Sequence, residues 1–168
     1  MDASMPCHAF VYKYPVLSPK LISTVQVSHN NRMKEVSALW DTGATVTCVS
    51  MELAKELSLV PTGMREIRTP SGAKTVNTYL VDLELPNKVT VTNVMVCDSD
   101  IGTQGLGVLI GMNIILQGDF AVSNFNGKTT FTFRIPSQKE TNYVNEARLQ
   151  DLIGEKHGLG KRKKKKRN

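Results

Sequence analysis

Apolar and polar residues alternate along most of the first 135 positions of this chain. Phe10, Tyr12 and Tyr14 occupy every second position, which is typical of a half-buried β-strand. The same alternation, or a short apolar run between turn residues, predicts further strands over residues 21–28, 35–40, 45–49, 64–68, 74–85, 89–96, 108–111, 120–124 and 128–135. The pattern therefore indicates a fold made mostly of β-strands.

Turn residues between these strands predict two hairpins. The pair Asn126-Gly127 separates the last two strands, and Asn-Gly between alternating runs is a strong hairpin signal. The segment Thr69-Pro70-Ser71-Gly72 separates strands 64–68 and 74–85, so we expect it to form the tip of a second hairpin.

Helical signals are few and short. Ser50 can cap a helix over residues 51–57, and a second short helix over 112–116 is stopped by Gly118. Beyond position 135 the composition becomes polar. An amphipathic helix is predicted there from the spacing of Val144, Ala147, Leu149, Leu152 and Ile153.

The composition is that of one domain with polar ends. At 168 residues the chain is long enough for a sizeable core, and no apolar run approaches the length that spans a bilayer. No basic segment followed by an apolar stretch opens the sequence, so no secretory signal is expected. Three scattered cysteines fit a reducing compartment, and we expect the cytoplasm. Cys48, in an apolar strand, is expected to be a packing residue.

The net charge of +6 comes from the C-terminus rather than from the body of the chain. Seven of the 21 basic residues lie in the run Lys161–Arg167, which leaves 14 basic residues against 15 acidic ones. Such a run repels itself and is predicted to be disordered. It is either a solvated tail or a weak contact for nucleic acid or another anionic surface.

The strongest candidate for chemistry is Asp41-Thr42-Gly43-Ala44, which an apolar run precedes. A strand that ends in this turn can hold a carboxylate at the floor of a cleft, since glycine allows the bend and the threonine hydroxyl can brace it. Asp-Thr-Gly alone also fits an ordinary surface turn. However, the apolar segment Leu109-Ile110-Gly111 follows about seventy residues later, just before a short helix.

These two motifs, with the hairpin tip between them, resemble the single-turn aspartic proteases of the retropepsin family. The resemblance covers roughly residues 21–135, and Gly-Met-Asn-Ile-Ile after position 110 is more similar to the bacterial retropepsin-like proteins than to the viral ones. Retropepsins often place arginine after the second glycine, whereas this chain has Met112-Asn113, so the ion pairs around that helix are expected to differ.

The resemblance implies an all-β, closed barrel or sandwich with short helices and one lobe per chain. It also implies that both chain ends join an interfacial sheet, for which 10–14 and 131–135 are the candidates. The expected organisation is an N-terminal segment (1–20), a protease domain (21–135), a C-terminal extension with a helix (136–160) and a disordered basic tail (161–168).

The function implied is that of an aspartic endopeptidase that acts as a homodimer on peptide or protein substrates. Water would be activated between Asp41 of two subunits, since the chain has one such turn. By resemblance, the catalytic residues are Asp41, Thr42 and Gly43. The expected substrate-binding residues are Ala44, Thr69, Pro70, Ser71, Gly72 and Ala73. Those expected to support the site are Leu109, Ile110 and Gly111.

Three alternatives to this function were compared with the sequence: a second catalytic turn, a metal site and a non-catalytic dimer. Asp98 and Asp100 lie in a polar loop that lacks an Asp-Thr-Gly turn, so no second catalytic turn is expected. His8, His29 and His157 are scattered, and no metal or cofactor is expected. The alternative function is a catalytically silent dimer of the same fold that serves as a protein-binding or scaffold module.

Overall fold

The computed structural model of the chain describes residues 8–69, 72–148 and 150. The chain divides into two compact units, residues 1–138 and residues 139–168. In the second unit residues 143–148 are helical, within the segment where an amphipathic helix is predicted. Most of the remainder of that helix and the run Lys161–Arg167 lie outside the described residues. No helix in the described part of the chain is long and apolar enough to cross a membrane.

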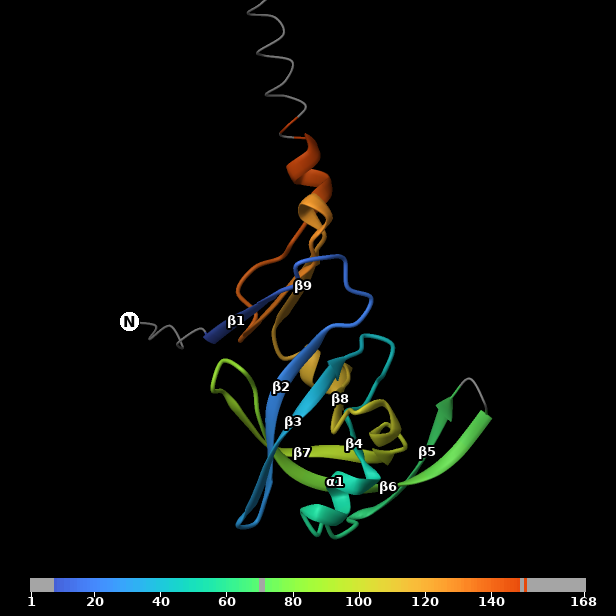
Figure 1. Cartoon of the computed structure of the whole chain (residues 1–168). Coiled ribbons are helices and arrows are strands. Elements are labelled where there is room, and N and C mark those ends of the chain that lie inside the picture. The colour runs from blue at the N-terminus through green and yellow to red at the C-terminus, as the bar shows by residue number, and fades with distance from the viewer. Residues whose placement is uncertain (1–7, 70–71, 149, 151–168) are drawn as a thin grey trace, which may run out of the picture. The chain divides into compact units, whose positions relative to one another are not determined.

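Strands of the first unit close into a barrel (Figure 1). The ring runs in the order β2-β3-β8-β4-β7-β6 and is closed by pairing between β2 and β6, while β5 continues the sheet beyond β6. The predicted all-β barrel is therefore confirmed. Its strands are β2 (Ile22–His29), β3 (Arg32–Trp40), β4 (Cys48–Ser50), β5 (Gly63–Thr69), β6 (Gly72–Glu84), β7 (Thr90–Ser99) and β8 (Val108–Ile110).

Two short helices accompany the barrel, α1 (Met51–Glu56) and α2 (Met112–Ile115). The predicted cap of α1 is confirmed, because the Ser50 hydroxyl accepts a 3.1 Å hydrogen bond from the backbone N–H of Leu53. The strand predicted over 45–49 is corrected: it begins only at Cys48. At Thr47 the backbone N–H donates to the side chain of Asn113 instead of a strand, while its carbonyl accepts a 3.1 Å hydrogen bond from the Cys97 N–H of β7.

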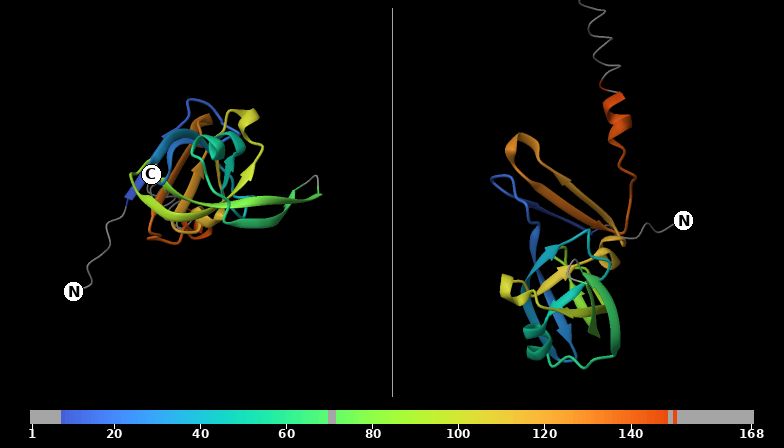
Figure 2. Two further views of the ribbon diagram at one scale, coloured as in Figure 1. Left: turned by 90° about the horizontal axis from the view of Figure 1, so that it is seen from below. Right: turned by 90° about the vertical axis from the view of Figure 1, so that its right-hand side faces the viewer.

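A second, antiparallel sheet has the strand order β1-β10-β9. It contains β1 (His8–Lys13), β9 (Asp119–Ser123) and β10 (Thr130–Ile135), and the β9–β10 hairpin is prominent in the right-hand view of Figure 2. The predicted Asn-Gly turn of this hairpin is confirmed, with φ of 52° at Asn126 and 72° at Gly127. His8 pairs with Ile135, so the two segments expected to share a sheet do so.

An aromatic cluster joins this second sheet to the barrel. The ring of Trp40, at the end of β3, lies 5.7 Å from Phe120 in a stacked arrangement and 5.0 Å from Phe133. Phe131 and Phe133 are completely buried. The indole N–H of Trp40 donates a 2.9 Å hydrogen bond to the hydroxyl of Ser23, which satisfies its one polar atom inside the core.

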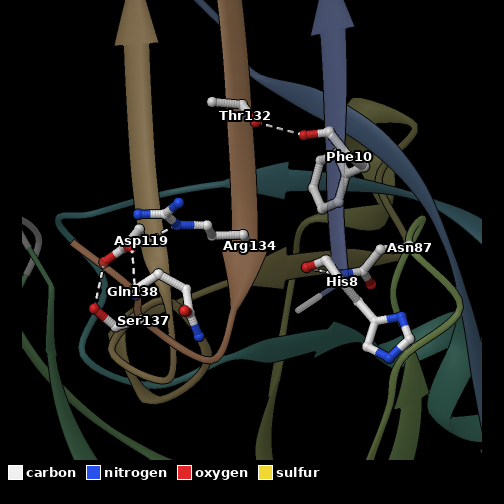
Figure 3. A network of polar contacts seen from close by, with 8 residues as sticks. All are labelled: His8, Phe10, Asn87, Asp119, Thr132, Arg134, Ser137 and Gln138. Atoms are coloured by element: carbon white, nitrogen blue, oxygen red, sulfur yellow. Dashed lines mark hydrogen bonds and ion pairs between the residues drawn. The ribbon is translucent and has the colours of Figure 1, made fainter. Parts of the chain in front are cut away.

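The second sheet also holds the segment that follows β10 (Figure 3). The carboxylate of Asp119, at the start of β9, accepts a 2.7 Å hydrogen bond from the guanidinium of Arg134. The same carboxylate accepts hydrogen bonds from the Ser137 hydroxyl and, at 2.9 Å, from the Gln138 backbone N–H. One acidic side chain therefore fixes the end of the first unit against the edge of its sheet.

The aromatic cluster gives a direct test of the packing. Replacing Phe133 by alanine removes a fully buried ring, so we expect the free energy of unfolding to fall by about 3–5 kcal/mol. Phe125→Ala is the matched control, because that ring is 79% exposed and its loss should change stability by less than about 0.5 kcal/mol. Chemical denaturation followed by fluorescence of the single tryptophan measures both. Equal effects of the two substitutions would contradict the packing described.

Candidate active site

The candidate site lies where β8 runs between β3 and β4. β8 pairs in parallel with β3 and antiparallel with β4, so the chain leaves β3, turns at residues 41–47 and returns on the other side of β8. The backbone N–H of Asp41 continues this pairing with a 2.9 Å hydrogen bond to the carbonyl of Ile110. The sheet therefore holds the backbone of the candidate acid itself.

The turn fixes one oxygen of the Asp41 carboxylate and leaves the other available. Oδ1 accepts a 2.8 Å hydrogen bond from the backbone N–H of Gly43, and the Asp41 carbonyl accepts one of 3.2 Å from Ala44. A Cβ at position 43 would lie 3.1 Å from Oδ1, a tight contact that glycine avoids. Oδ2 has no hydrogen-bond partner among the described residues, and the side chain is half-exposed.

The second motif presses directly against this turn. A Cβ on Gly111 would lie 2.6 Å from the carbonyl carbon of Val46 and 2.9 Å from the carbonyl oxygen of Ala44, both backbone atoms that cannot yield cheaply. The contact is hydrogen-bonded as well, since the Met112 N–H donates to the Ala44 carbonyl at 2.8 Å. The structure thus brings Asp41, Gly43, Ala44, Ile110 and Gly111 together.

Thr47 and Asn113 complete this junction, and neither was predicted as a site residue. The Asn113 side-chain oxygen accepts hydrogen bonds from the Thr47 backbone N–H at 2.8 Å and from its hydroxyl at 2.7 Å. The same hydroxyl accepts a 3.1 Å bond from the Gly111 N–H, and the Asn113 amide donates to the Met95 carbonyl at 3.2 Å. These bonds satisfy a completely buried threonine and tie both motifs to β7.

An apolar row runs across the barrel face next to Asp41. In β3 and β8 the residues Trp40 and Ile110 point into the core, so their neighbours Leu39 and Leu109 point to the opposite face, as Asp41 does. The register extends this row to the thiols of β4 and β7. We call these four residues the groove-face row: Leu39, Leu109, Cys48 and Cys97.

Burial and neighbouring charges change the pKa of one thiol in this row, that of Cys48. The pKa of Cys48 is raised to about 11, chiefly by burial and then by the nearby Cys97, Asp98 and Asp41. The thiol is therefore protonated at neutral pH and behaves as a small apolar group. The predicted packing role of Cys48 agrees with this half-buried, neutral state.

The remaining predicted residues lie apart from this junction. Thr42 is exposed, and its side chain forms no hydrogen bond with the described residues. Thr69, Gly72 and Ala73 lie at the far end of the β5–β6 hairpin, where Thr69 pairs with Gly72. Pro70 and Ser71 are outside the described residues. The predicted hairpin is confirmed.

The hollows found elsewhere on the first unit do not contain the candidate acid. Three of them, of about 290, 400 and 300 Å³, are lined by residues of α1, β2, β6 and their connecting segments, without Asp41. Within the described ranges, no three His, Cys, Asp or Glu side chains converge in a way that could hold a metal ion. Asp41 itself is half-exposed.

Three solved structures are similar to this chain to different degrees. A retropepsin-like aspartic protease from Rickettsia conorii superposes with a TM-score of 0.51 at 15% identity, covering 77% of this chain and 96% of that one. The simian foamy virus (mac) protease matches at 20% identity with a TM-score of 0.41, over 56% of this chain and 92% of its own. The retroviral protease-like domain of Ddi1 from Leishmania major matches at 14% identity with a TM-score of 0.36, over 71% of this chain and 95% of its own. The Rickettsia structure shows that the fold is retropepsin-like.

A family model establishes the relationship at the level of sequence. The family described as "gag-polyprotein putative aspartyl protease" matches residues 25–117, more than half of the chain and the part that contains both motifs. A search of curated proteins finds no match. The chain belongs to the gag-polyprotein aspartyl protease family.

The Thr47–Asn113 junction yields a prediction about stability. Asn113→Ala leaves the buried Thr47 hydroxyl and N–H without their shared acceptor, so we expect a loss of about 1–3 kcal/mol in the free energy of unfolding. Gln117→Ala is the control, because that exposed side chain only bonds a carbonyl at the end of α2 and should cost under about 0.5 kcal/mol. Thermal and chemical denaturation measure both. A cost for Asn113→Ala no larger than the control would show that the junction contributes little.

Proposed function

We propose that this chain is an aspartic endopeptidase whose active site is completed by a second copy of itself. The observation that carries the proposal is the Asp41 carboxylate: it is held by the backbone of β8 and by Gly43, half-exposed, with one oxygen unengaged by the described residues. A rigidly held, half-exposed acid is suited to position a water molecule and a peptide carbonyl.

The proposed chemistry needs two carboxyl groups that share one proton. The ionised carboxylate takes a proton from the attacking water, while the protonated one donates a hydrogen bond to the scissile carbonyl oxygen as negative charge develops on it. Two carboxylates a few ångström apart cannot both ionise cheaply, so their pKa values separate and the pair titrates as a unit.

A twofold dimer would supply the second carboxyl group. Asp98 of the same chain does not serve as this second group, because its carboxylate is engaged within the fold. It accepts hydrogen bonds of 3.0 Å from the Asn77 backbone N–H and the Tyr79 hydroxyl. Symmetry can instead place Asp41 of both copies across one axis. In that arrangement Thr42 would hydrogen-bond to the partner's backbone, which suits its exposed position.

The second sheet is the proposed interface. β1 and β9 are its outer strands, and each pairs on one side only among the described strands. The aromatic cluster connects this sheet to Trp40, the residue before Asp41. Contacts made by the sheet would therefore be transmitted directly to the base of the active-site turn.

The substrate is proposed to be an extended, largely apolar peptide. Ala44 and the hairpin tip, residues 69–73, would bind its backbone, with the β5–β6 hairpin closing over it from each subunit. The partly exposed members of the groove-face row, Leu39, Cys48 and Leu109, are apolar or neutral, which favours apolar side chains of the peptide. Leu109, Ile110 and Gly111 would support the site from below.

Replacing the acid tests the proposal. Asp41→Asn keeps the size of the side chain and its acceptor for the Gly43 N–H, but removes the ionisable group, so we expect peptide cleavage to fall by at least about 1,000-fold with the dimer intact. Asp100→Asn, in an exposed bend, is the control and should retain activity. A peptide library at pH values between about 3 and 7, covering the range in which a carboxyl pair titrates, measures cleavage.

Dilution and mixing provide the check on the dimer. Activity per chain should fall as the protein is diluted, and an excess of Asp41→Asn chains should suppress the wild type, because mixed dimers have only one ionisable carboxyl group. Equal specific activity in a verified monomer would contradict the dimeric mechanism. A wild-type dimer that cleaves no peptide at any of these pH values would favour the silent scaffold instead.

A further inference from the structure

Cys48 and Cys97 face one another across β4 and β7, and the proposed chemistry uses neither thiol. They are register partners in a parallel pair, so their side chains project from the same face. Val49, the next residue of β4, belongs to the buried barrel core and so points to the opposite face. The two thiols therefore lie side by side in the groove-face row, Cys48 half-buried and Cys97 completely buried.

Both thiols are free, and one of them lacks a partner. Cys97 is completely buried, and its sulfur has no hydrogen bond with any residue that the structure describes. Cys48 is half-buried and donates only a weak, 3.6 Å bond to the Val46 carbonyl. A ligand could thus reach the pair from the Cys48 side and engage the unpartnered sulfur beneath it.

The spacing of the strands favours one kind of ligand over a disulfide. Neighbouring strands lie about 4.8 Å apart, which is within the Cα separations that disulfides allow, but a disulfide also needs its two Cβ atoms at about 3.8 Å, closer than two side chains that project in parallel one strand spacing apart. β4 is held on both sides, by β8 and β7, which opposes such an approach. Two metal–sulfur bonds of about 2.3 Å placed end to end join two sulfur atoms about 4.6 Å apart. This is close to the spacing of two side chains that project in parallel from neighbouring strands.

The number and type of ligands narrow the choice of metal. No third His, Asp or Glu joins the two thiols into a larger metal-binding group within the described part of the chain, so the four ligands of a structural zinc site are not present there. Two thiolates alone suit a soft ion that accepts linear coordination, of which Cu(I) is the biological example.

We propose that Cys48 and Cys97 form a two-thiolate site for a soft monovalent metal ion such as Cu(I). Binding breaks two S–H bonds and forms two metal–sulfur bonds, with release of two protons and no change of oxidation state. The complex then carries one net negative charge. Its position beside the substrate groove rests on the proposed function, whereas metal binding itself does not.

The surrounding charges set the pH dependence of the site. Burial, the partner thiol, Asp98 and Asp41 raise the pKa of Cys48, and burial raises that of Cys97 although the Arg65 guanidinium opposes this. Both thiols are protonated at neutral pH, so the ion must displace two protons. Affinity should therefore rise by about 100-fold for each pH unit between 6 and 8.

Anaerobic titration of the full chain with Cu(I), in competition with a chromophoric Cu(I) chelator, tests the proposal. The starting protein carries Cys7→Ser, which removes the third cysteine. We expect one Cu(I) per chain, with the stated pH slope. Cys48→Ser and Cys97→Ser in this background should each lower the affinity at least 100-fold, with circular dichroism confirming the fold. Should Cys97→Ser fail to fold, the half-exposed Cys48 provides the deciding variant.

Three results would overturn the site: no uptake of Cu(I), uptake that Cys48→Ser leaves unchanged, or a Cys48–Cys97 disulfide that forms readily in air in place of metal binding. The titration needs no peptidase activity. A protein that binds Cu(I) but cleaves no peptide would contradict the proposed function alone, and an active protein that does not bind Cu(I) would contradict this site alone.

Discussion

Close contact between two backbone turns is the constraint on which the rest of this structure depends. Gly111 lies so near the carbonyls of Ala44 and Val46 that no side chain fits between them. Hydrogen bonds from Met112 to Ala44 and from Gly111 to Thr47 fix the distance from both sides. The turn that carries Asp41 is consequently fixed by hydrogen bonds to the sheet. Such rigid support is the condition for placing a carboxylate accurately.

The same constraint links the active-site turn to the rest of the fold. β8 lies between β3 and β4, where it delivers Gly111, and this arrangement sets the groove-face row. Trp40, at the end of β3, contacts the second sheet through its stacked ring pair with Phe120. In the proposed dimer, the surface that joins the two copies and the acid that they share are thus separated by a single residue of the chain.

Local patterns in the sequence predicted much of this arrangement. Alternation predicted the strands, Asn126-Gly127 predicted its hairpin, and Ser50 predicted the start of α1, because each depends on residues only a few positions apart. Asp41-Thr42-Gly43 and Leu109-Ile110-Gly111 could be paired only through a family resemblance, since nothing local shows that they touch.

The features that the sequence did not reveal all depend on long-range pairing. Thr47 and Asn113 are 66 residues apart, and their bond takes the place of a strand hydrogen bond at the Thr47 N–H, where a strand was predicted. The side-by-side placement of Cys48 and Cys97 follows from the register of two parallel strands. Spacing along one chain contains no information about such a register unless the topology is known.

The most direct measurement of the central claim is the distance between the two Asp41 carboxyl groups in a crystal structure of the protein bound to a non-cleavable peptide. The account predicts a twofold dimer with the nearest carboxyl oxygens about 3 Å apart, within reach of one shared proton and one water molecule. Carboxyl groups that face different grooves, or a peptide bound to a single chain with its own Asp41 sealed from it, would contradict the account and leave only the fold.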